Sequence, residues 1–121
     1  MTTDPNDALA RVRQEFTRGL PERLQRIRSG LTELIQGFND RAAEQFHVAS
    51  HALVGMAATF EAHDMAEQAR ELATLGRRWR KEGAAPQPEL DEAQQGVDRL
   101  DGTIHAFLAQ AEDSTTSDRQ G

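Results

Sequence analysis

Two histidines, His47 and His51, lie one helical turn apart in a stretch of sequence that carries no charge. From His47 to Phe60 there is no Asp, Glu, Lys or Arg, although these residues make up 28% of the 121 residues. A neutral imidazole nitrogen is a competent nucleophile toward phosphorus near neutral pH, because the reference pKa of histidine is about 6.5. Two histidines at positions i and i+4 can also bind zinc, but they need further ligands. The other histidines, His63 and His105, form no His-Glu-x-x-His arrangement, so we expect a nucleophile and no metal site.

Helical spacing separates this stretch into two faces. At about 100° per residue, one apolar stripe contains Phe46, Ala49, Leu53, Met56, Ala57 and Phe60. His51 lies roughly 160° from Leu53, and it shares its face with His47, Val54, Gly55 and Ala58. Glycine in a helix interior costs about 0.5–1 kcal/mol relative to alanine. The glycine at position 55 therefore indicates that something must come close to His51.

The segment His51-Ala52-Leu53-Val54-Gly55-Met56-Ala57 resembles the active helix of histidine-containing phosphotransfer (HPt) domains. The pattern of that family reads His-x-Leu-Lys-Gly-x-Ala, followed by an aromatic residue. The matching positions here are His51, Leu53, Gly55, Ala57, Phe60 and Ala62, and the resemblance spans roughly residues 8–110.

The resemblance implies a phosphorelay intermediate. His51 would accept a phosphoryl group from an aspartate in the receiver domain of a response regulator and pass it to another receiver. The catalytic Mg²⁺ is expected in the partner receiver, with no cofactor in this chain. There is no Gly-rich phosphate loop and no Walker motif, so we expect no ATP site, and whether the chain counts as an enzyme stays open. His47, Val54, Gly55 and Ala58 would support the site or line the docking face.

A basic cluster, Arg77-Arg78-Trp79-Arg80-Lys81, interrupts an otherwise acidic protein. Arg77 lies about one turn beyond Ala73 on the helix expected next to His51, where it would help to receive a phosphoryl group or an acidic receiver surface. Alternatively, it only stabilises the C-terminus of its helix, as cations there generally do. We favour this second interpretation for Arg78, Arg80 and Lys81, and we expect Trp79 in the core.

Three positions depart from the family pattern. Val54 replaces a lysine expected to steady the phosphoryl group, Ala73 replaces a Gln or Glu that holds the other ring nitrogen, and Glu61 replaces a glycine that ends the helix. Control of the His51 tautomer would then come from His47 or Gln68, or be absent. Two alternatives stay open. One is the phosphoacceptor domain of a chemotaxis-type or hybrid sensor histidine kinase, and the other is an inactive adaptor bundle.

We expect the elements that position His51 to be helices, because no segment alternates between apolar and polar residues as a strand does. We expect an antiparallel four-helix bundle with an additional short N-terminal helix. The short helix carries Ala8, Leu9, Val12 and Phe16 and ends at Gly19-Leu20-Pro21. Asn39 or Asp40 should cap the central helix, and His63-Asp64 should begin the next. Gly83-Ala84-Ala85-Pro86-Gln87-Pro88 forms the clearest linker, and the final helix carries core residues from Leu90 to Leu108. We expect a flexible N-terminus at 1–7, the bundle at 8–111 and a disordered tail at 112–121.

Composition narrows the classes of function. The length suits one domain, and the chain has no cysteine. The formal net charge of −6 argues against nucleic-acid binding, which favours a basic surface. No apolar run reaches the ~20 residues of a membrane span, so we expect a cytoplasmic protein with no membrane partner.

Overall fold

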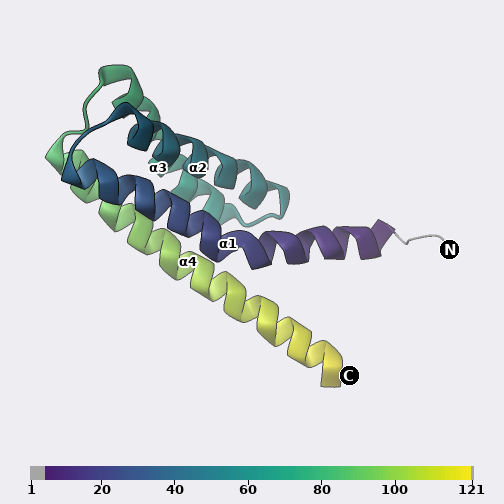
Figure 1. The fold of residues 1–121 in the computed structure, drawn as a ribbon. Helices are drawn as coiled ribbons and strands as arrows, with labels where there is room; N and C mark the ends of the chain where they lie inside the picture. The colour runs from purple at the N-terminus through teal and green to yellow at the C-terminus, as the bar shows by residue number, and fades with distance from the viewer. Residues whose placement is uncertain (1–4, 121) are drawn as a thin grey trace.

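The computed structural model describes residues 5–120, and it describes side chains for residues 5–111. The order of elements is α1 (Pro5–Gln36), α2 (Asp40–Thr59), α3 (His63–Glu82) and α4 (Gln87–Gln120). The described residues contain no strand, so the all-α prediction is confirmed. Short connections at 37–39, 60–62 and 83–86 place consecutive helices antiparallel, as Figure 1 shows.

The helices form a four-membered ring around one core. Helix α1 packs against α2 and α4, and α3 packs against the same two helices. At one end of the core, Phe16 stacks on Phe60 with ring centroids 4.8 Å apart and meets the edge of Phe107 at 5.7 Å. Nearer the other end, Phe46 and Trp79 are fully buried with centroids 5.3 Å apart. The prediction of Trp79 as a core residue is confirmed.

The prediction of a separate N-terminal helix is wrong. Helix α1 runs without a break from Pro5 to Gln36 and contains Pro21. Proline removes one backbone hydrogen bond and crowds the carbonyl group four residues earlier. A helix bends at proline, and does not end there, when the residues before and after it both pack against the core. Here Leu20 and Leu24 are buried on either side of Pro21, and Figure 1 shows α1 changing direction near its middle. The N-terminal part leaves the bundle, with Leu9 60% exposed.

The ends of α2 explain where the central helix begins and ends. The Asn39 side chain accepts a hydrogen bond from the Ala42 amide at 2.8 Å, which confirms the predicted cap. At the other end, the Ala62 amide donates to the Ala57 carbonyl at 2.8 Å, and the Glu61 amide donates to Ala58 at 3.1 Å. This pair of bonds is a Schellman motif. It places Glu61 in the left-handed region at φ 61°, a conformation that favours glycine.

Two predicted boundaries fall partly outside the described residues. Residues 1–4 and residue 121 lie outside, and so do the side chains of residues 112–120, so the predicted flexible N-terminus and disordered tail stay predictions. In the part of the chain that is described, no helix is long and apolar enough to cross a membrane.

Candidate functional site

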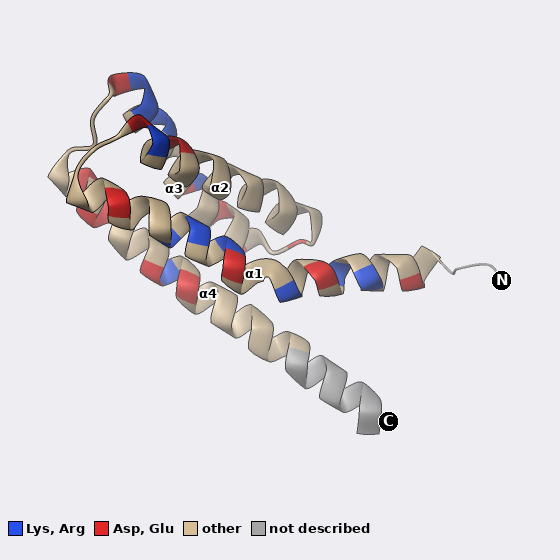
Figure 2. Cartoon of the chain, viewed as in Figure 1, with Lys and Arg blue, Asp and Glu red and all other residues tan. Residues whose placement is uncertain are grey.

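His51 stands in the middle of α2 on the side that faces away from the core. Its side chain is exposed, whereas Leu53 and Ala57 on the opposite side are fully buried. Figure 2 shows that charged residues on α2 are confined to its first turns, and the rest of the helix is drawn without charge. The structure therefore shows a buried stripe and an exposed His51 on opposite sides of α2, but His47 and Val54 of the predicted outward face are half-buried, and the polar Ser50 is fully buried.

Small side chains surround His51 on this surface. Exposed neighbours of His51 on α2 are Val48, Ala52, Gly55 and Ala58, and together with His51 we call them the His51 face; the exposed Glu44 lies on the same side two turns earlier. A Cβ atom added at Gly55 would meet no heavy atom within 4 Å. No contact inside the chain therefore requires glycine at this position, and the space beside the imidazole is open to solvent. Val54 is half-buried and packs partly against the core.

On the α3 side, His47 and Arg80 form a polar pair. The Arg80 Nη1 atom lies 2.9 Å from His47 Nδ1, and the rings of His47 and His51 have centroids 6.1 Å apart. The two helices come very close here, because a Cβ on the buried Gly76 would lie 3.0 Å from the Cα of His47. Partial burial lowers the pKa of His47 below its ordinary value of 6.5, and the nearby Arg80, His51 and Arg77 lower it further.

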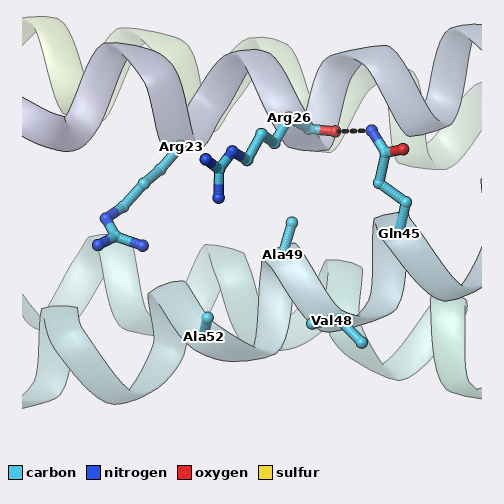
Figure 3. Close-up of a pocket in the computed structure, with 6 residues that line it drawn as sticks. All are labelled: Arg23, Arg26, Gln45, Val48, Ala49 and Ala52. Atoms are coloured by element: carbon cyan, nitrogen blue, oxygen red, sulfur yellow. Dashed lines mark hydrogen bonds between the residues drawn. The ribbon is translucent and has the colours of Figure 1, made fainter.

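On the α1 side, a shallow groove separates α1 from α2. Its lining residues are Arg23, Arg26, Gln45, Val48, Ala49 and Ala52. Figure 3 shows both arginines reaching from α1 over the groove, and the Gln45 side chain donating to the Arg26 carbonyl at 3.0 Å. The Nε atom of Arg23 is buried without a hydrogen-bond partner among the described residues. Val48, with 54% of its surface exposed, joins this groove to the His51 face.

The structure brings some of the predicted site residues together and separates others. His47, Gly55 and Ala58 lie around His51 as expected, whereas Arg77 is exposed on α3 and acts electrostatically on His47. Ala73 is buried, and no hydrogen bond joins Gln68 to His51 among the described residues. The Gln68 Oε1 atom is buried without a partner.

Sequence reasoning missed two features of the site. Arg80 was expected only to stabilise its helix end, but it binds His47. Its role depends on the pairing of two helices, which no local pattern specifies. Val48 is different, because it lies only about 60° from His51 on the helix, so helical spacing alone would have placed it on the same face. Among the described residues, no group of three or more His, Cys, Asp or Glu could hold a metal ion.

Comparison with protein families agrees with this geometry. The sequence model of the Hpt domain matches residues 11–113, so the chain belongs to the Hpt domain family. Members of this family take part in histidine phosphotransfer in phosphorelays and interact with the receiver domains of response regulators. A search of curated proteins found no match, and a search of solved structures found none.

Proposed function

We propose that this chain is a phosphorelay intermediate whose phosphoacceptor is His51. It would take a phosphoryl group from an aspartyl phosphate in one receiver domain and pass it to an aspartate in another. The observation that supports this most strongly is the exposed imidazole in a segment with no charged residue from His47 to Phe60, bordered by Gly55 and Ala58.

The chemical step requires only one nucleophilic nitrogen from this chain. The lone pair of an unprotonated ring nitrogen of His51 attacks the phosphorus as a new N–P bond forms. The bond between phosphorus and the aspartate oxygen breaks, and the carboxylate leaves with the electron pair. The other ring nitrogen keeps its proton. The reverse sequence of bond changes delivers the group to the second aspartate, so no external reactant is consumed in either half.

The transfer is in line, so the imidazole must enter the acidic pocket of the receiver. A large side chain beside His51 would hold the two proteins apart, and the small residues of the His51 face allow a close approach. We assign the Mg²⁺ and most of the transition-state stabilisation to the receiver. The arginines on α1 and α3 would then contact the acidic rim of its pocket.

The test is transfer from receiver domains of the source organism, each phosphorylated with acetyl phosphate. Wild-type protein should gain phosphate that is labile to acid and stable to alkali, whereas His51→Gln should gain none. His105→Gln is the matched control, because His105 is an exposed histidine on α4, and it should behave as wild type. Equal labelling of the wild type and His51→Gln would refute the assignment.

An inactive adaptor is the second candidate, and a specific observation favours it. Val54 and Ala73 replace the two polar residues of the family, and both side chains lie against or within the core. An adaptor would bind receivers but remain unlabelled by every phosphorylated receiver. A phosphoacceptor domain of a sensor histidine kinase would instead be labelled by the kinase and ATP.

A further inference from the structure

The bond between Arg80 and His47 fixes the tautomer of His47. A guanidinium group has no acceptor atom and keeps its protons in proteins, so Arg80 Nη1 must donate and His47 Nδ1 must accept over the 2.9 Å that separates them. A neutral histidine that accepts at Nδ1 carries its hydrogen on Nε2. His47 therefore presents an N–H donor on the side of the ring away from Arg80.

The ring that carries this donor is the neighbour of His51 on α2, with 6.1 Å between the two ring centroids. A hydrogen bond to a charged oxygen is shorter and stronger than one between neutral groups. No cation comes from Val54, which is apolar and half-buried, and the cations that act on the neighbouring His47 are Arg80 and Arg77.

We propose that His47 binds the phosphoryl group on His51 through Nε2–H, and that Arg80 is the positioning residue that fixes this tautomer. The inference rests on the proposed function of His51 and extends it. His47 and Arg80 together would do what the lysine of the family pattern does, at whose position this chain has Val54. Arg80 and Arg77 on α3 act on His47 together with His51, and Glu44 lies one turn earlier on the same helix; a dianion on His51 would add a negative charge beside the two arginines.

A merely structural role for the pair is less consistent with the packing. Contacts that do not involve Arg80 already hold α2 against α3, namely the close approach of Gly76 to the His47 backbone and the contact between the tilted rings of Phe46 and Trp79. Arg80 is exposed, so its replacement removes no core contact. Variants at position 80 should therefore fold as the wild type does.

The experiment measures the lifetime of phosphohistidine in the full chain. Protein is loaded with phosphoramidate, a small donor, and hydrolysis of phospho-His51 is followed by ³¹P NMR. Arg80→Ala and His47→Leu should each shorten the half-life roughly tenfold to 100-fold, the scale of one hydrogen bond to a charged group, and the double variant should be no worse than His47→Leu. Arg78→Ala is the control, because Arg78 is the exposed neighbour that binds Glu89 at 3.2 Å.

A second measurement separates positioning from general electrostatics. The ¹⁵N shifts of His47 in the unphosphorylated protein should show an Nε2–H tautomer in the wild type and in Arg78→Ala, and a mixture in Arg80→Ala. Unchanged half-lives in Arg80→Ala and His47→Leu would overturn the inference, as would failure of phosphoramidate to load His51. Failure of the proposed function is a different result, in which loaded protein keeps its normal half-life but delivers phosphate to no receiver.

Discussion

Enlarging the residue at position 55 should stabilise the protein and impair its phosphotransfer at the same time. Gly55 is exposed in the interior of α2, and a Cβ there would meet no heavy atom within 4 Å. Glycine in a helix interior is about 0.5–1 kcal/mol less favourable than alanine, and leucine is nearly as good a helix former as alanine. We therefore expect Gly55→Ala and Gly55→Leu each to raise the free energy of unfolding by about 0.5–1 kcal/mol.

The same leucine would occupy the space through which a receiver reaches His51. Extra atoms in a close-packed contact typically raise its free energy by about 1–3 kcal/mol. The same increase in the activation free energy of phosphotransfer would reduce its rate roughly fivefold to 150-fold. Gly55→Ala adds a single carbon and should have a smaller effect than Gly55→Leu. A graded loss of rate alongside a gain in stability cannot come from unfolding, so it would isolate steric access.

The assay is single-turnover transfer from a phosphorylated receiver, with urea unfolding measured on the same samples. Gly102→Leu is the matched control, because Gly102 is an exposed helical glycine with equally empty surroundings. It lies on α4, which does not pack against α2, so it should gain stability and keep the wild-type transfer rate. The reasoning would be refuted if Gly55→Leu transferred at the wild-type rate, or if Gly55→Ala destabilised the fold.

Three further outcomes are expected. Glu61→Gly should raise the free energy of unfolding in urea by about 1 kcal/mol, because a non-glycine residue at positive φ is strained by roughly 1–2 kcal/mol; an unchanged midpoint would mean that the turn carries no strain. Val48→Asp should weaken receiver binding about tenfold in calorimetry by burying a charge, while the exposed position keeps the fold intact; unchanged affinity would exclude Val48 from the interface. Because burial and Arg80 lower the pKa of His47 below 6.5, the unfolded chain binds a proton before the folded one as the pH falls. The contribution of His47 to stability is therefore complete above pH 6.5 and is lost below it, and His47→Gln should flatten the pH dependence of unfolding there, whereas an identical profile would contradict the lowered pKa.

The sequence predicts those features of the fold that depend on neighbours along one helix. The cap at Asn39, the start of α3 at His63 and the exposure of His51 all follow from local preference and helical periodicity, and the structure agrees with each. The prediction at Pro21 is wrong because proline occurs both in the first turn of a helix and inside a bent helix. Which of the two forms here depends on the burial of Leu20 and Leu24 on either side of it.

Contacts between two helices cannot be predicted from the pattern of residues along either helix. From local preference alone, Gly76 is only an unfavourable residue in the interior of α3. In the structure it is buried, and it allows the α3 backbone to approach within contact of His47. That approach brings Arg80 to within 2.9 Å of the His47 ring. The polar part of the candidate site thus depends on a glycine 25 residues from His51 in the sequence, a relation that only the paired helices reveal.

The charge around His51 runs against the charge of the whole chain. The formal net charge is −6, yet α2 carries no charged residue beyond Glu44, and arginines lie on both sides of it, of which Arg26 is paired with Glu22 at 3.1 Å. Arg23 and Arg26 line the groove on the α1 side, and Arg77 and Arg80 lie on the α3 side. Screening in physiological salt limits each charge interaction to about 8 Å. An acidic partner near this face is therefore attracted by its arginines, whereas one that approaches another part of the surface meets mainly acidic groups. These charges favour one orientation of the partner before the two proteins touch. A neutral α2 between two basic edges therefore suits a site at which a small, reactive ring must meet an acidic pocket in one orientation only.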